Sequence, residues 1–120
     1  MRTFVESRIF AARVREFMDD AGLREVQNEL MANPQKGAVI PGCAGLRKVR
    51  VADRSRGKGK RGGARVIYLD IPQAGRMDLI AIYGKDEQED LTADRKRVLI
   101  RLAELAKAEA TAKLGRKGRR

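Results

Sequence analysis

Five residues in the middle of the sequence carry side chains that can bind and act on a phosphodiester. They are two cations one residue apart, an arginine that opens a later apolar run, and a tyrosine and a lysine at the end of a third run: Lys48, Arg50, Arg65, Tyr83 and Lys85. If these positions converge, they form a phosphate clamp with one aromatic platform for a base. The alternative is that the cations only keep an open sheet face hydrated.

The chain contains no histidine, which excludes the familiar pair of imidazoles as the acid and base of RNA cleavage. A lysine whose pKa is lowered by neighbouring arginines can instead take the proton from the RNA 2′-hydroxyl. Arginines can hold the charge that develops on the pentavalent phosphate, and a lysine or a tyrosine can protonate the leaving oxygen. Because an arginine donates two hydrogen bonds in a fixed fork, we expect Arg65 to stabilise the transition state and to contribute little to folding.

No cofactor and no metal are predicted. The single cysteine, Cys43, fits a reducing compartment and leaves too few soft ligands for zinc. Four acids in a short stretch could suggest Mg²⁺, but acids in a loop before a helix are more often solvated or favour the helix N-terminus: Asp86, Glu87, Glu89 and Asp90. The absence of a membrane-length apolar run and of a signal-peptide pattern predicts a cytoplasmic protein without membrane contact.

The periodicity of apolar residues predicts one α+β domain over residues 1–114, followed by a disordered basic tail at 115–120. We expect a short strand or extended lead-in at 3–6, helices at 7–18 and 23–31, a loop at 33–45, strands at 46–51, 64–71 and 76–83, and a helix from 93 to about 114. Ser7 and Thr92 are candidate N-caps.

The order of these elements predicts a small antiparallel sheet with the N-terminal helices packed on one face and a C-terminal helix, the other face being free to bind. Alternation places Val49 and Val51 on one face of their strand and the two cations on the other. The C-terminal helix is expected to pack through an apolar set: Val98, Leu99, Leu102, Leu105 and Ala106.

Positive charge is concentrated in the segment that holds three of the candidate site residues. The formal net charge is +11, and residues 46–76 carry ten Lys/Arg and two Asp/Glu, or +8. A small domain this basic usually binds a polyanion. The loop at 53–63 lacks the spacing of a phosphate-binding Walker loop and reads as a nonspecific nucleic-acid arm or a plain solvated loop. The predicted RNA-binding residues are Arg47, Arg54, Arg56, Lys58, Lys60 and Arg61.

Three segments, taken in order, resemble a known family. Pro41–Arg50, Gly62–Tyr68 and Ile82–Thr92 resemble the HigB-like branch of the RelE/ParE toxin superfamily of type II toxin–antitoxin systems. The similarity covers roughly residues 3–105. Its most specific parts are the Arg-Val-Ile-Tyr strand and the Tyr-Gly-Lys segment that leads into Asp-Leu-Thr.

The resemblance implies a compact α+β fold and cleavage of mRNA in the ribosomal A site. It also implies inhibition by an antitoxin, often with a helix-turn-helix DNA-binding domain, whose complex with the toxin binds operator DNA. In the family, basic residues on the sheet act as acid, base and phosphate stabiliser; Lys48, Arg50, Arg65 and Lys85 fall on such positions. The sequence departs from RelE where that protein has an arginine and a tyrosine, here Asp86 and Thr92, which leaves the general acid open.

Two other function classes remain open at this point. ParE-like members of the superfamily poison DNA gyrase, although an intact set of sheet cations favours RNA cleavage. A non-catalytic nucleic-acid-binding protein, with the basic tail as its main contact, is the third class.

Overall fold

The fold is built on a five-stranded sheet whose strands lie in the order β1-β5-β4-β3-β2. The computed structural model describes residues 2–53, 63–85, 87 and 91–118, with only the backbone at 115–118. The strands are β1 (Thr3–Glu6), β2 (Ala38–Val39), β3 (Arg47–Val51), β4 (Ala64–Ile71) and β5 (Arg76–Gly84). The helices are α1 (Arg8–Arg13), α2 (Asp20–Ala32) and α3 (Ala93–Gly118), with 3-10 turns at Val14–Glu16 and Pro72–Ala74. The predicted α+β fold class is confirmed.

The sheet is mixed, because β1 pairs in parallel with β5 while the other pairs are antiparallel. The predicted hairpin of β4 and β5 is present, and its turn ends at Gly75, which adopts a left-handed φ of 58°. Glycine has no Cβ and takes this conformation at little cost. Residues 3–6, predicted as a short strand or an extended lead-in, form β1, which pairs with β5 at the edge of the sheet.

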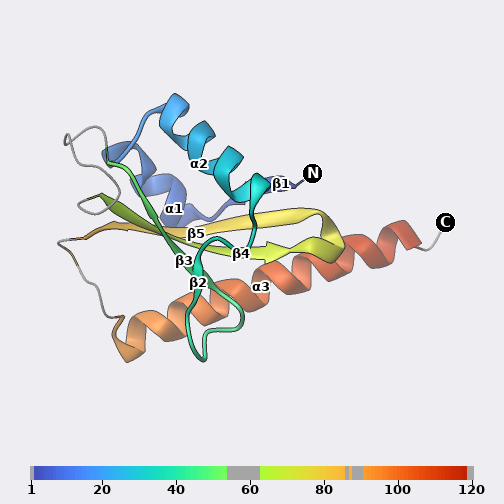
Figure 1. Cartoon of the computed structure of the whole chain (residues 1–120). Helices are drawn as coiled ribbons and strands as arrows, with labels where there is room; N and C mark the ends of the chain where they lie inside the picture. The colour runs from blue at the N-terminus through green and yellow to red at the C-terminus, as the bar shows by residue number, and fades with distance from the viewer. Residues whose placement is uncertain (1, 54–62, 86, 88–90, 119–120) are drawn as a thin grey trace.

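The N-terminal helices cover one face of the sheet, as predicted (Figure 1). Phe10, Phe17 and Leu30 from this helical layer are buried in one cluster with the strand residues Val49 and Tyr68. Both caps are made by side chains: Ser7 Oγ accepts from the Phe10 amide at 3.0 Å, and Asp19 Oδ1 accepts from the Gly22 amide at 2.9 Å. Ser7 also donates to the Ile80 carbonyl at 2.5 Å, so the start of α1 is tied to β5.

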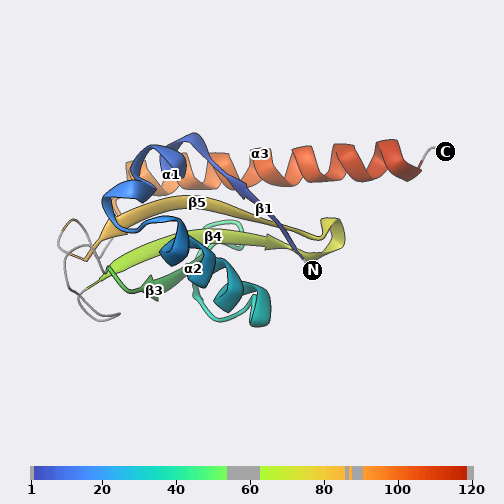
Figure 2. The same cartoon turned by 90° about the horizontal axis from the view of Figure 1, so that it is seen from above.

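The opposite face is not free, because α3 lies across it (Figures 1 and 2). Its buried side chains are Leu99, Ala103, Ala106 and Ala110, which pack in a second cluster that includes Ile67 and Leu69 of β4. The prediction that this face would be open to ligands is therefore wrong over β4 and β5. The small alanine side chains allow the helix backbone to approach the sheet closely.

Part of the apolar set predicted to pack α3 does not do so. Leu99 and Ala106 are buried, whereas Val98 is 51% exposed, Leu105 is 49% exposed and Leu102 is only partly buried. Thr92 caps the helix as predicted, since its Oγ1 accepts from the Arg95 amide at 3.2 Å. The helix continues to Gly118, past the point where the basic tail was predicted to begin. Lysine and arginine extend a formed helix at little cost.

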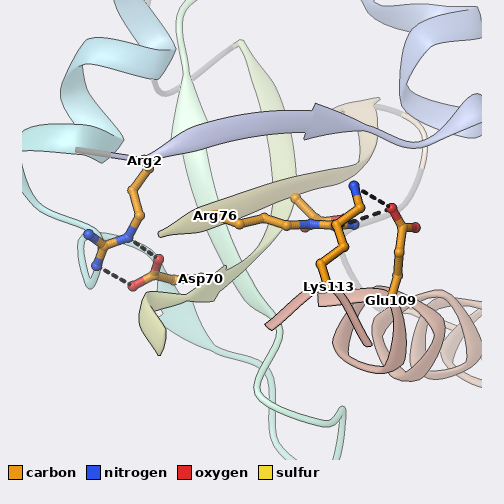
Figure 3. Close-up of polar contacts among 6 residues, drawn as sticks. Arg2, Asp70, Arg76, Glu109 and Lys113 are labelled. Atoms are coloured by element: carbon orange, nitrogen blue, oxygen red, sulfur yellow. Dashed lines mark hydrogen bonds and ion pairs between the residues drawn. The ribbon is translucent and has the colours of Figure 1, made fainter. Parts of the chain in front are cut away.

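Ion pairs fix the second half of α3 to the sheet (Figure 3). The Arg76 guanidinium, on β5, donates to Asp78 at 2.7 and 3.0 Å and to Glu109 of α3 at 3.2 Å. These carboxylates raise the pKa of Arg76, chiefly through the hydrogen bonds that Arg76 donates to Asp78. Lys113 pairs with the same carboxylate of Glu109 at 3.2 Å, nearer the solvent. The position of α3 along β5 is therefore fixed by the ion pair between Arg76 and Glu109, in addition to the apolar packing of the helix on the sheet.

None of the helices formed by the described residues is long and apolar enough to cross a membrane.

Candidate nucleic-acid interface

The register of the sheet brings three predicted site residues into one row. Arg50 on β3 lies opposite Arg65 on β4, and Arg65 lies opposite Tyr83 on β5. Residues directly opposite one another project from the same sheet face, with Cβ atoms roughly 5 Å apart. We call Arg50, Arg65 and Tyr83 the cross-strand row.

The other two predicted site residues lie near this row. Lys48 lies two residues before Arg50 on β3, opposite Ile67, and so projects from the same face. Lys85 lies in the turn that follows β5, and its amide donates to the Gly63 carbonyl at 3.2 Å. The register thus brings Lys48, Arg50, Arg65 and Tyr83 to one face of the sheet, and Lys85 follows at the end of β5.

Exposure divides the five residues into a surface group and a buried group. Arg50 and Lys85 are exposed and Lys48 is half-buried. Arg65 is only 2% exposed and Tyr83 only 4% exposed. The side chains that are accessible to a phosphate are therefore those of Lys48, Arg50 and Lys85. Arg65 and Tyr83 are buried.

The burial of Arg65 corrects the expectation that it contributes little to folding. Its Nη1 donates to the Ala64 carbonyl at 3.3 Å, deep in the sheet. A buried charge is tolerated only when its hydrogen-bonding capacity is largely met, so truncating it leaves compensating groups unsatisfied. We infer that Arg65 stabilises the fold and that Arg50 is the better-placed phosphate contact.

Helix α3 limits the approach to the row from one side. Leu99 lies in the same apolar cluster as Ile67 and Tyr83, so the helix covers the β5 end of the row. The β3 end carries the exposed Arg50. A polyanion can therefore reach the row from the β3 side, and from the end of the sheet marked by Lys85.

The guanidinium of Arg47 makes hydrogen bonds within the protein. Its Nη1 donates to the Gly37 carbonyl at 2.8 Å and to the Gln35 carbonyl at 3.3 Å. These bonds hold the segment after α2 and make Arg47 a structural residue, a role that its place in a basic run did not predict. The other predicted RNA-binding residues, Arg54, Arg56, Lys58, Lys60 and Arg61, lie outside the described residues.

No protein-family model matches this chain. Among residues 2–53, 63–85, 87 and 91–118, no group of three or more His, Cys, Asp or Glu side chains could hold a metal ion. Of the four acids before α3, Glu87 is bonded within the protein, and Asp86, Glu89 and Asp90 lie outside the described residues. The candidate interface is thus a set of cations on a sheet.

Glu87 fixes the chain at the end of β5, immediately beyond the cross-strand row. Its two carboxylate oxygens each accept from the Arg13 guanidinium at 2.8 Å, and one also accepts from the Gly84 amide at 2.9 Å. The hydrogen bond from Arg13 is the main reason that the pKa of Glu87 is lowered. This contact joins α1 to the segment that carries Lys85, a link between residues far apart in sequence that no local pattern could indicate.

We expect the Arg13–Glu87 pair to make the protein sensitive to acid. The pKa of Glu87 is lower in the folded protein than its ordinary value of 4.5, so its stabilisation is present above that pH and is lost as the pH falls through the folded pKa. Because the Glu87 side chain is 35% exposed, the loss should stay below about 1 kcal/mol. Urea unfolding between pH 6 and 3 should show a shallower loss of stability in Glu87→Gln than in the wild type. Glu104→Gln, on the exposed side of α3, is the control; an equal change in both variants would contradict the assignment.

Tyr68 anchors the segment between α2 and β2, a role that the sequence did not reveal. Its hydroxyl donates to the Pro34 carbonyl at 2.8 Å and accepts from the Gly37 amide at 2.9 Å. Burial is the main reason that the pKa of Tyr68 is raised. A Cβ at Gly37 would lie 2.8 Å from the Tyr68 ring, so only glycine allows this approach. The anchored segment lies beside β3 and supports the strand that carries Lys48 and Arg50.

Tyr68→Phe should lower the free energy of unfolding by about 1–3 kcal/mol, because the Gly37 amide loses its partner in a buried position. Urea unfolding monitored by circular dichroism measures this. Thr111→Val, which removes an exposed hydroxyl on α3, should change stability by no more than about 0.5 kcal/mol. If the two variants are equally stable, the Tyr68 hydroxyl does not anchor the segment.

Proposed function

We propose that this protein is the toxin of a type II toxin–antitoxin system and cleaves mRNA bound to the ribosome. The observation that supports the proposal is the sheet register that brings Lys48, Arg50, Arg65 and Tyr83 to one face, with the exposed Lys85 in the turn that follows β5. The resemblance of the three segments that contain these residues to the HigB-like branch supports the same assignment.

The reaction that suits these groups is attack of the RNA 2′-hydroxyl on the adjacent phosphorus. The bond from 2′-oxygen to phosphorus forms as the bond from phosphorus to the 5′-oxygen breaks, leaving a 2′,3′-cyclic phosphate and a 5′-hydroxyl. In this proposal Lys48 accepts the 2′-proton, and Arg50 stabilises the charge on the phosphate oxygens. The exposed ammonium of Lys85 is a better-placed proton donor for the leaving oxygen than the largely buried Tyr83.

The partners follow from this activity. The ribosome and its mRNA are the substrate complex, and the ribosome supplies the orientation of the RNA that a site without histidine needs. A cognate antitoxin, with a helix-turn-helix domain that brings the complex to operator DNA, keeps the toxin inactive. The proposed location is the cytoplasm, where ribosomes, mRNA and antitoxin meet.

The test is cleavage of a defined mRNA by the purified protein with and without ribosomes, with the new 5′ ends mapped. We expect cuts at ribosome-bound codons and none in free mRNA. DNA breaks that depend on gyrase, without RNA cleavage, would favour the ParE-like class. Salt-sensitive RNA binding without cleavage would favour a non-catalytic nucleic-acid-binding protein.

A further inference from the structure

An apolar groove lies where the edge of β5 is left open. Strand β1 pairs only with Arg76–Leu79, so within the described part of the chain no strand borders the rest of β5 on that side. The groove there has a volume of about 330 Å³ and separates α1 from the start of α3. Its lining is mainly aliphatic: Ile9, Ala81, Ile82, Leu91, Val98 and Leu99.

Exposed apolar side chains on both sides continue this groove onto the surface. Ile9 of α1 is 42% exposed, and Val98 of α3 is 51% exposed. Val98 also begins a stripe with Leu102 and Leu105, at positions i, i+4 and i+7, that the packing of α3 leaves partly uncovered. Side chains at this spacing lie on one face of a helix. We call the groove together with this stripe the α1–α3 surface.

Arginines border the α1–α3 surface. Arg95 lines the groove, and Arg101 is exposed on α3 between the turns that carry Val98 and Leu105. Arg13 also lines it, but its guanidinium is engaged by Glu87; Asp94 is the one acid among the described residues that line the groove, and it pairs with Arg97. A concave apolar surface bordered by arginines complements an amphipathic helix whose apolar stripe is flanked by carboxylates.

We propose that the α1–α3 surface binds an acidic amphipathic helix of a partner protein. A second copy of this chain fits poorly, because each copy carries a net charge of +11 and would present like charges to the other. The groove meets the cross-strand row at its buried end, where Tyr83 lines it, and lies on the α1 side of β5, whereas Arg50 lies on β3. Only the interpretation of the partner as the antitoxin depends on the proposed function; the docking surface itself does not.

The test uses a fluorescein-labelled synthetic peptide helix with leucines at i, i+3, i+4 and i+7 and glutamates on both flanks. A second peptide carries lysines in place of the glutamates. Fluorescence anisotropy with the full chain should show binding of the acidic peptide only. Val98→Asp, Leu105→Asp and the pair Arg95→Glu with Arg101→Glu should each weaken binding at least tenfold. Val39→Asp is the matched control, because Val39 is 53% exposed on β2 at the opposite edge of the sheet.

Several outcomes would overturn the proposal. These are failure of the acidic peptide to bind, equal binding of the lysine peptide, or binding that Val98→Asp and Leu105→Asp leave unchanged. Tighter binding of phosphatidylglycerol vesicles through Val98 would replace the partner helix by a lipid surface, and self-association lost in Val98→Asp would replace it by a second copy. RNA cleavage by ribosome-bound Val98→Asp should equal that of the wild type. If the protein binds the acidic peptide but does not cleave RNA, the proposed function is wrong and the docking surface still holds.

Discussion

Arg76→Ala should lower the free energy of unfolding by about 3–5 kcal/mol. The reason is that Arg76 and Asp78 are each only 5% exposed, and the guanidinium is the group that compensates the Asp78 carboxylate. Removing it leaves a carboxylate buried without its bidentate partner and releases Glu109, so α3 also loses this ion pair to β5. Urea unfolding at neutral pH measures the loss.

Two further variants define the cause of this loss. Lys113→Ala removes an ion pair to the same Glu109, but the side chains are 59% and 54% exposed, so we expect a change of about 1 kcal/mol or less. The double variant Arg76→Met with Asp78→Leu removes both buried charges and should recover most of the stability lost in Arg76→Ala. If Arg76→Ala costs no more than Lys113→Ala, the buried pair does not hold the fold.

Arg50→Ala should reduce kcat/KM for ribosome-dependent cleavage about a hundredfold, which corresponds to about 3 kcal/mol. Arg50 is the exposed member of the cross-strand row, so its guanidinium can reach the scissile phosphate without a change in the core. Arg50→Lys should recover only part of the rate, because an ammonium keeps the charge but not the two-pronged hydrogen bond. Stability should change by no more than about 0.5 kcal/mol in either variant.

Arg65→Ala provides the contrast. Because Arg65 is 2% exposed, this variant should be less stable than the wild type, and its loss of activity should follow the loss of folded protein. Lys96→Ala, an exposed cation on α3, is the matched control and should cleave at the wild-type rate. Full activity of folded Arg50→Ala would remove the phosphate contact from the proposed mechanism.

The parts of the fold that follow from local periodicity were predictable. Val49 and Val51 face the core while Lys48 and Arg50 face away from it, because neighbouring residues of a strand project to opposite sides. The caps Ser7 and Thr92 were predictable for the same local reason: the capping oxygen and the amide that it accepts from are three residues apart.

Contacts between distant segments were not predictable. The parallel pairing of Thr3 with Arg76 has no local signature. The sequence pattern predicts only part of the buried face of α3, because leucines outweigh alanines in it, whereas Ala103 and Ala110 also make the contact with the sheet. Because α3 packs on the sheet through this face, it covers the β5 end of the cross-strand row. The exposure of Arg65 and Tyr83 could therefore not be derived from strand alternation alone.

The pairing of β1 with β5 also sets an order of events during synthesis. Thr3 can pair with Arg76 only after Arg76 has been synthesised, 76 − 3 = 73 residues later, so β1 joins the sheet late. The second apolar cluster needs Leu99 and Ala110, which are translated later still. Long-range closure of this kind slows folding and leaves the early segments exposed while the chain grows. A nascent chain therefore acquires its assembled cross-strand row, and with it the proposed ability to act on RNA, only after α3 has been translated.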